Sequence, residues 1–283
     1  MHSSQLATRF ARNTNVLRSE LPLAEGQMRS VAPSIFFAAG KHQSRSERYT
    51  YIPTIEVLRG LRKEGFAPFM VAQGKSRIEG KAEFTKHLIR MRHAGQITGK
   101  AEVPEIILIN SHDGASSYQM LSGAFRWVCQ NGMVVGDICN DIRIAHKGGA
   151  KDEVIEGAFR VLDEFETVDA SIDDMKALTL KPEEQRAFAT AALALRYGEQ
   201  KDGLPPAPIT AEQLDQPRRI EDRGDSLWLA FMRLQENSTV GGLPGRSAQG
   251  RRIRTREVAS IDRGVSLNRA LWVLAEEMKR LKA

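Results

Sequence analysis

The stretch that decides the fold is FTKHLIRMRHAGQITGKAEVPEIILINS, residues 84–111. Two runs rich in apolar residues, Phe84 to His93 and Pro104 to Ser111, stand on either side of a glycine-containing loop, Gly95 to Lys100. Such runs, bounded by turn residues, are typical of neighbouring strands in a sheet. A similar run from Pro68 to Arg77 precedes them. The sequence therefore predicts three consecutive strands in this region.

Segments on both sides of this core predict further elements. A short amphipathic helix is expected from Pro53 to Gly65, because a proline suits a first helical turn and a glycine suits a helix end. Before it, the apolar run Ile35 to Phe37 predicts a short strand. Residues 117–129 first alternate and then repeat at helical spacing, which favours a strand that passes into a helix near Phe125. Residues 134–144 predict one or two more short strands.

The second half of the chain predicts helices. Apolar residues recur at helical spacing in four segments, which are residues 152–165, 182–197, 225–236 and 266–281. In the last segment they repeat at 4-3-4-3, a face that packs on another helix or on a partner chain. The fold class that follows is α+β, with an antiparallel sheet core and flanking helices in the N-terminal half and a mostly helical C-terminal half.

Shifts in composition divide the chain into five expected parts. These are a loosely ordered arm (1–30), an α+β domain (31–150), a helical extension (151–197), a linker with four prolines (198–217), and a helical C-terminal region with an arginine-rich loop (218–283).

Composition excludes several classes of protein. The 283 residues are 41% hydrophobic, which is enough to bury a core and excludes wholesale disorder. Two cysteines cannot form a disulfide framework, and no stretch is apolar for long enough to span a membrane. The first residues contain no apolar signal core, so we expect a cytoplasmic protein. Glycine-rich nucleotide-binding loops and zinc-ligand spacings are absent from the sequence, so no cofactor is expected.

Basic residues concentrate in two stretches. The chain carries 41 lysines and arginines against 35 acids, a net charge of +6, which favours polyanionic partners. Residues 75–100 hold seven basic residues and two acids, and residues 246–256, RSAQGRRIRTR, hold five arginines and no acid. Residues 151–185 show the reverse, with eleven acids and four basic residues. The sequence therefore predicts a basic side and an acidic side.

The two basic stretches form the candidate nucleic-acid-binding site. As a strand, residues 84–95 would place their basic side chains mostly on one parity and so present a basic face. The arginine-rich loop suits phosphates, because guanidinium groups bind them bidentately. The alternative is a solvated loop, or one that pairs with the acidic residues 151–185. The expected phosphate-binding residues are Lys86, Arg90, Arg92, Arg246, Arg251, Arg252, Arg254 and Arg256.

A second candidate site is the pair His112 and Asp113, which follows the apolar run IILIN and precedes a glycine. A histidine and a carboxylate at the mouth of a sheet suit general acid–base chemistry or part of a metal site. The alternative is an Asp-Gly turn in which His112 is hydrogen-bonded nearby. A metal site would need further ligands. The candidates are Asp137, Asp141 and His146, but their spacing is not diagnostic of a metal site.

Three blocks of the sequence resemble a known family. The blocks are YTYIPTIEVLRGLRKEGFAP (49–68), PEIILINSHDGASSYQMLSGAFRWVCQNGMVVGD (104–137) and QENSTVGGLPGRSAQGRRIRTREVASIDRGVSLNRALWVLAEEM (235–278). From about residue 30 onward the chain resembles plasmid- and prophage-borne proteins known as domain of unknown function 932. The resemblance implies an accessory protein of mobile DNA, and it brings no established activity or catalytic residues. The order of elements also resembles the core of phage single-strand annealing proteins, which form oligomers and lay single-stranded DNA along a basic groove.

Three hypotheses of function follow. The first, which we favour, is a non-enzymatic accessory protein of mobile DNA that binds DNA, with single strands preferred, and that forms homo-oligomers. The second is a metal-dependent enzyme acting on nucleic acid, centred on His112 and Asp113. The third is a protein-interaction module, such as an inhibitor of a host defence system, which would use the apolar face at 267–281 and the acidic stretch 151–185. None of the three involves a membrane.

Overall fold

The structure is a computed structural model of the chain. It describes residues 14–37, 53–75, 82–96, 101–112, 117–126, 131–135, 142–144, 150–198 and 207–282. The chain divides into two compact units. The first comprises residues 1–165 and 259–261, and the second comprises residues 166–258 and 262–283.

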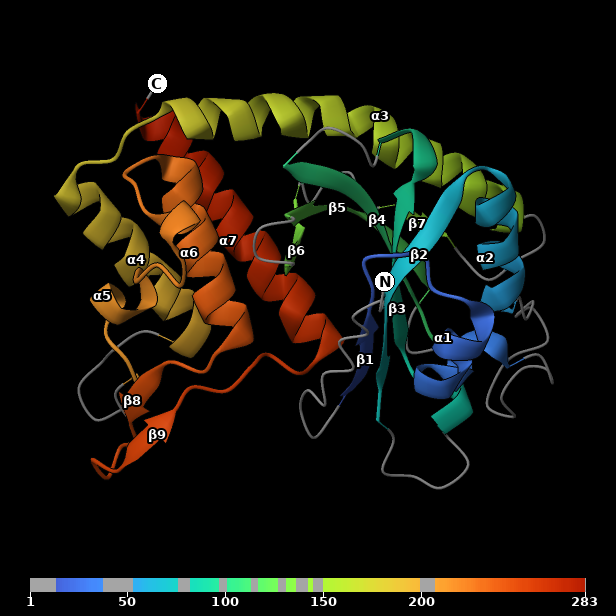
Figure 1. Cartoon of the computed structure of the whole chain (residues 1–283), viewed down its shortest axis with the longest axis horizontal. Helices are drawn as coiled ribbons and strands as arrows, with labels where there is room; N and C mark the ends of the chain where they lie inside the picture. Colours follow the sequence, from blue (N-terminus) through green and yellow to red (C-terminus); the bar gives the residue numbers. More distant parts are fainter. Residues whose placement is uncertain are drawn as a thin grey trace. The chain divides into compact units, whose positions relative to one another are not determined.

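The first unit is built on a seven-stranded antiparallel sheet (Figure 1). The first six strands lie in chain order across the sheet, and the seventh pairs with the fifth. The strands are β1 (Thr14–Arg18), β2 (Phe66–Gly74), β3 (His87–His93), β4 (Glu102–Asn110), β5 (Tyr118–Arg126), β6 (Asn131–Val134) and β7 (Ile142–Ile144). The α+β class and the three central strands are therefore confirmed.

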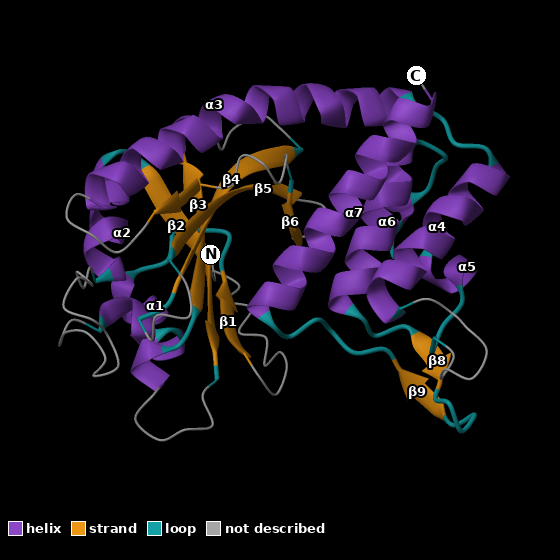
Figure 2. Cartoon of the chain, turned by 180° about the vertical axis from the view of Figure 1, so that it is seen from behind, coloured by secondary structure: helices purple, strands orange, loops and turns teal. Residues whose placement is uncertain are grey.

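Helices cover one face of this sheet, as Figure 2 shows for α1 and α2. The helical segments of the unit are α1 (Glu25–Val31), η1 (Pro33–Phe36), α2 (Thr54–Lys63), η2 (Ala82–Phe84), η3 (Ala94–Gln96) and the beginning of α3 (Ala150–Ala177). Met28, Leu58 and Val154 from three of these helices share one buried core with Ile89 and Ile106 from the sheet. Because side chains alternate along a strand, the neighbours Arg90 and Glu105 point to the opposite face.

Three local expectations for this unit are wrong. The run Ile35 to Phe37 does not form a strand; Ile35 and Phe36 are buried in η1, which Pro33 begins. The loosely ordered arm predicted at residues 1–30 is wrong for its described part, residues 14–30, because β1 pairs with β2 and α1 packs in the core; residues 1–13 lie outside the described part of the chain. Strand β5 continues through Phe125 to Arg126 rather than passing into a helix, because it keeps its ladder with β4 over that length. Tertiary pairing overrides the local helical spacing there.

The second unit is helical, as expected. It contains the end of α3, then α4 (Pro182–Tyr197), α5 (Ala211–Leu214), η5 (Ile220–Asp222), α6 (Leu227–Val240) and α7 (Ile261–Lys282), together with a two-stranded hairpin, β8 (Pro244–Arg246) and β9 (Arg252–Arg254). Helix α6 is almost entirely buried, and its Phe231 packs against Trp272 of α7 with ring centroids 5.7 Å apart. The apolar repeat of α7 contributes Leu267 and Leu271 to the interior of this unit, whereas Leu281 is exposed.

The proline-rich segment 198–217 does not separate the two units. The division falls within α3, between Phe165 and Glu166, and both ends of the segment belong to the second unit. Its described part carries α5, which Thr210 caps by accepting a hydrogen bond from the backbone of Gln213 at 3.2 Å. No helix in the described part of the chain is both long enough and apolar enough to cross a membrane.

Candidate functional site

The arginine-rich loop folds into the β8–β9 hairpin of the second unit. Its strands pair in the register Pro244 with Arg254, Gly245 with Ile253, and Arg246 with Arg252. Residues directly opposite each other in a hairpin point to the same face, and every second residue along a strand does so too. The side chains of Arg246, Arg252 and Arg254 therefore share one face. We call these three residues the arginine face.

The opposite face of the hairpin rests on the helical unit at Gly245. The backbone N–H of Arg246 donates to the carbonyl oxygen of Pro208 at 2.8 Å. A Cβ atom at position 245 would collide with that same carbonyl and would lie 3.0 Å from Ile209 Cγ2. Glycine is therefore required at position 245, because only a residue without a side chain allows the backbone of Pro208 to approach so closely. The hairpin is seated on its glycine side and directs its arginines away from the unit.

Two arginines outside the hairpin hold its two ends. Arg218 Nη2 donates to the carbonyl oxygen of Gly241 at 2.5 Å, just before β8. Arg196 Nη2 donates to the carbonyl oxygen of Arg256 at 2.8 Å, just after β9, and its Nε donates to the Ser238 carbonyl at 2.9 Å. Each guanidinium donates a hydrogen bond to a carbonyl that would otherwise need a water molecule as its donor. The base of the hairpin is therefore fixed rather than free.

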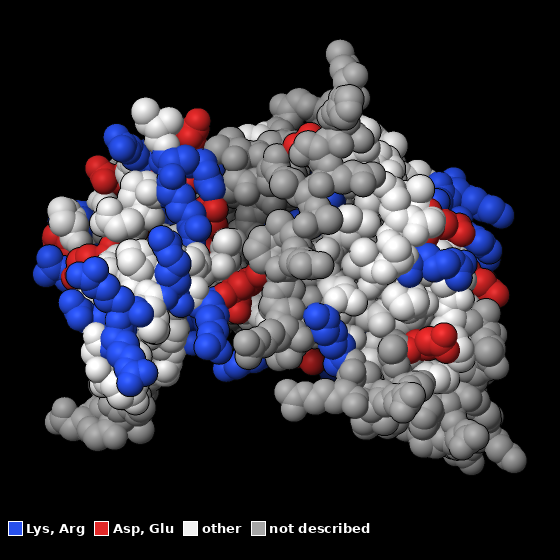
Figure 3. Space-filling model, turned by 60° about the horizontal axis from the view of Figure 1, so that its bottom comes forward, with Lys and Arg blue, Asp and Glu red and all other residues white. Residues whose placement is uncertain are grey.

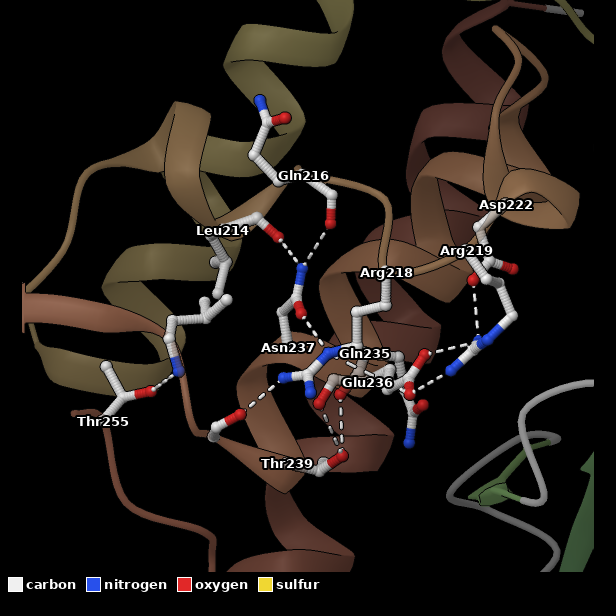
Figure 4. Close-up of polar contacts among 12 residues, drawn as sticks. Leu214, Gln216, Arg218, Arg219, Asp222, Gln235, Glu236, Asn237, Thr239 and Thr255 are labelled. Carbon is white, nitrogen blue, oxygen red and sulfur yellow. Dashed lines mark hydrogen bonds and ion pairs between the residues drawn. The ribbon is translucent and has the colours of Figure 1, made fainter.

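A network of polar contacts surrounds the second unit's Arg218, as Figure 4 shows. Arg218 Nε donates to Asn237 Oδ1 at 2.6 Å, and Asn237 Nδ2 donates to the carbonyls of Leu214 and Gln216. Arg219 donates to both carboxylate oxygens of Glu236, at 2.8 and 2.6 Å. Because Glu236 and Asn237 are buried on α6, these bonds satisfy polar groups that would be costly to leave unpaired.

The arginines of the hairpin carry their charge on the surface without acidic partners. Arg246, Arg251, Arg252, Arg254 and Arg256 are all exposed. None of them forms an ion pair with a carboxylate of the described residues; Arg246 and Arg254 each donate instead to a backbone carbonyl, at 3.1 and 2.8 Å. Figure 3 shows lysines and arginines gathered on the face of the second unit that carries the hairpin. The alternative prediction, that this loop pairs with the acidic residues 151–185, is not confirmed, because none of these arginines forms an ion pair with a described residue of that stretch.

The prediction of a second basic face, on β3, is wrong. Arg90 and Arg92 are 7% and 2% exposed, and both bind Glu105 of the neighbouring strand, with Nε–Oε distances of 2.5 and 2.9 Å. Arg90 also donates to the carbonyl of Met133 and lies so close to Gly132 that a side chain there would collide with it. Neither arginine is therefore accessible to a phosphate. Lys86, at the start of β3, is half-buried.

Two aromatic rings enclose the Arg92 side chain. The guanidinium carbon of Arg92 lies 4.3 Å from the ring centre of Phe69 and 3.8 Å from that of Phe125. Burial lowers the pKa of Arg92, and the charge of Glu105 opposes that shift. Residues on both faces of β3 are buried, although an antiparallel sheet can leave one face in water, and a pattern of alternating charges does not reveal this.

His112 lies in a buried polar cluster rather than at an open mouth of the sheet. Thr54 Oγ1 lies 2.9 Å from His87 Nε2, 3.3 Å from His112 Nε2 and 3.0 Å from Asn110 Nδ2. His87 Nδ1 in turn lies 2.9 Å from Ser34 Oγ, whose hydroxyl donates to Gln73 Oε1. The four side chains of Thr54, His87, Asn110 and His112 are fully buried.

The donors and acceptors fix the direction of this chain of hydrogen bonds. Because the Ser34 hydroxyl donates to Gln73, its oxygen accepts from His87 Nδ1–H, which leaves His87 Nε2 as an acceptor. Asn110 Nδ2 donates to Thr54 Oγ1, and with His87 in this neutral form Thr54 donates its only hydroxyl proton to His87 and accepts from His112.

Several residues considered for chemistry lie outside the described part of the chain. Asp113, the proposed companion of His112, is one of them; the others are Asp137, Asp141, His146 and both cysteines. Among the residues that the structure describes, no group of three or more His, Cys, Asp and Glu side chains is placed to hold a metal ion. The acid–base and metal hypotheses for His112 and Asp113 remain predictions.

The sequence patterns did not indicate the residues that position the hairpin. Arg196 and Arg218 lie far from the loop in sequence, the first in a predicted helix (182–197) and the second at the start of the predicted helical C-terminal region (218–283). Likewise, Ser34, Thr54 and His87 were not linked to His112, because no spacing connects positions that only the sheet brings together. A signal was available at Gly245, since a glycine inside a strand often marks a close approach of another backbone.

Comparison with known proteins identifies the family but no activity. Two proteins of Escherichia coli K12, the UPF0380 proteins YafZ and YfjQ, are each 50% identical to this chain over 275 residues, which is 97% of this chain and 98% of each relative. No solved structure matches the chain. The family model for the domain of unknown function 932 matches residues 41–272. The chain is therefore a member of this family.

Proposed function

We propose that this chain is a non-catalytic DNA-binding protein, an accessory protein of mobile DNA, and that it holds phosphates on the arginine face of the β8–β9 hairpin. In this proposal the anchors Arg196 and Arg218 position the hairpin, and single strands are preferred over duplex. Arg251 and Arg256, at the tip and the end of the hairpin, extend the contact.

One observation carries the proposal: three arginines share a face on which two of them lie directly opposite each other with no acid between them. Like charges opposite each other in a hairpin destabilise it. The arrangement becomes favourable when an anion binds between the guanidinium groups, and a phosphate accepts bidentate hydrogen bonds from each. Arg252 and Arg254, two positions apart on one strand, are spaced by about 7 Å, which is close to the spacing of successive phosphates along a nucleic-acid strand.

The test is fluorescence anisotropy with a labelled single strand and with the matching duplex, in a salt series. We expect binding at low salt that weakens steeply as salt rises, because phosphate contacts release counterions. A variant with all three residues of the arginine face changed to Gln should bind at least about tenfold more weakly, since each lost phosphate contact removes charge-assisted hydrogen bonds.

The matched control changes three arginines elsewhere on the same unit, Arg186, Arg223 and Arg280, to Gln. It removes the same net charge but leaves the hairpin intact. If the two triple variants lose affinity equally, binding reflects only the overall charge, and the hairpin is not the site. If the natural chain binds neither nucleic acid at low salt, the proposal is wrong.

A further inference from the structure

We infer that the open groove between α4 and α7, beside the base of the hairpin, receives an unpaired base of the bound strand. The inference rests on the proposed function and deepens it, because it identifies where a single strand would be distinguished from a duplex. The groove has a volume of about 420 Å³ and belongs entirely to the second unit.

The groove adjoins the arginine hairpin through one residue. Arg196 lines the groove and also donates to the carbonyl oxygen of Arg256, the last arginine of the hairpin loop, at 2.8 Å. Val258, two positions further along the chain, lines the groove as well, and its N–H donates to the Thr239 carbonyl at 2.9 Å. The groove therefore lies directly beside the base of the hairpin that carries the arginine face.

The lining of the groove suits a base attached to an anionic backbone. Its apolar residues are Leu195, Val258, Leu267 and Ala270. Leu195 is 44% exposed and, together with the apolar residues beside it in the groove, provides a surface that a flat ring can cover. Two guanidinium groups, Arg196 and Arg263, and one carboxylate, Asp262, stand around this surface. The positive charges outnumber the negative one, so the charge of the groove complements a phosphate backbone.

A duplex cannot use this groove in the same way. Its bases are stacked and paired, so placing one in the groove requires unstacking and unpairing, whereas a single strand presents bases at little cost. The hairpin alone contacts phosphates, which both forms of DNA offer. The groove therefore accounts for a preference for single strands that the hairpin alone would not provide.

The experiment compares an oligothymidylate with an abasic oligonucleotide of the same length, which keeps the sugar-phosphate backbone but has no bases. Both are labelled and titrated with the full chain, in natural form and as Leu195→Gln. The control variant is Leu281→Gln, which changes an equally apolar residue that is 75% exposed and lies at the other end of α7. Thermal unfolding of each variant verifies that the fold is unchanged.

The natural chain should bind the base-bearing strand about fivefold more tightly than the abasic strand, from burial of apolar surface. Leu195→Gln should remove most of this difference, and Leu281→Gln should keep it. Equal affinity of the natural chain for the two strands, or equal behaviour of the two variants, overturns the groove and leaves phosphate binding by the hairpin intact. Absence of binding to either strand overturns the proposed function itself.

Discussion

Arg90-Met91-Arg92 on β3 and Arg252-Ile253-Arg254 on β9 are the same pattern, an apolar residue between two arginines on a strand. In β3 both arginines are buried and share Glu105. In β9 both are exposed, and Arg246 stands opposite Arg252 where an acid would stabilise the pair. The partner strand, rather than the pattern itself, decides whether such arginines are buried in ion pairs or exposed to solvent.

The sheet of the first unit and the hairpin of the second also differ in how their polar side chains are paired. The sheet of the first unit buries charged and polar side chains and gives them partners, as it does for Glu105 and for the cluster around Thr54. The hairpin leaves its charges in water and without counterions from the described part of the chain. Changes in the first region should therefore affect stability, and changes in the second should affect binding.

The largest expected effect is at Glu105. Changing Glu105 to Gln removes the carboxylate that two buried guanidinium groups share, and it should lower the free energy of unfolding by about 3–5 kcal/mol. Urea unfolding followed by circular dichroism measures this. Glu277→Gln, on the exposed side of α7, is the control and should have little effect. A loss no larger than that of the control would mean that the buried ion pairs are not needed, and the comparison would fail.

A smaller loss is expected when Thr54 is changed to Val. The substitution conserves the shape of the side chain but removes the oxygen that His87, His112 and Asn110 share. Leaving these buried groups without that partner should cost about 2–3 kcal/mol in the free energy of unfolding. The same denaturation experiment tests it, with Thr190→Val on the exposed side of α4 as the control. An unchanged unfolding midpoint would contradict the role of the Thr54 hydroxyl in stabilising this cluster.

The third prediction concerns a substitution that shifts the hairpin without changing its charge. Gly245→Ala places a methyl group against the carbonyl of Pro208, so the hairpin must shift from its seat. We expect DNA affinity to fall severalfold, equivalent to about 1 kcal/mol, while the fold of the unit persists. Gly264→Ala is the matched control, because a Cβ there meets nothing within 4 Å. Similar affinities for the two variants would indicate that position of the arginines is unimportant.

The smallest expected effect, and the most specific, comes from Arg246→Glu. It converts the like-charge pair with Arg252 into an opposite-charge pair, which should stabilise the second unit by about 0.5 kcal/mol. DNA affinity should fall at the same time, because the arginine face loses a donor and gains a negative charge. Arg223→Glu changes the net charge equally on the same unit and serves as the control. A variant that binds DNA as well as this control would remove the arginine face from the site.

The sequence was a good guide to elements whose pattern and partners are local. The central strands, α2 and α4 follow from periodicity and from proline and glycine residues that act within a few positions. The burial of Arg90 and Arg92 could not be predicted in the same way, because it depends on Glu105 and Phe125 from neighbouring strands. The exposed arginines of the hairpin were found from charge alone, since no acid stands within the loop. The anchors Arg196 and Arg218 required the tertiary structure.

The most direct test of the account is the salt dependence of single-strand binding, measured by anisotropy between about 50 and 200 mM salt, for the natural chain and for the variant with Arg246, Arg252 and Arg254 changed to Gln. Each phosphate contact on a single strand contributes about 0.7 to the slope of log K against log salt. The account predicts that the variant's slope is shallower by about 2 and that its unfolding is unchanged. An equal slope for the two proteins would contradict the assignment of phosphate binding to the arginine face.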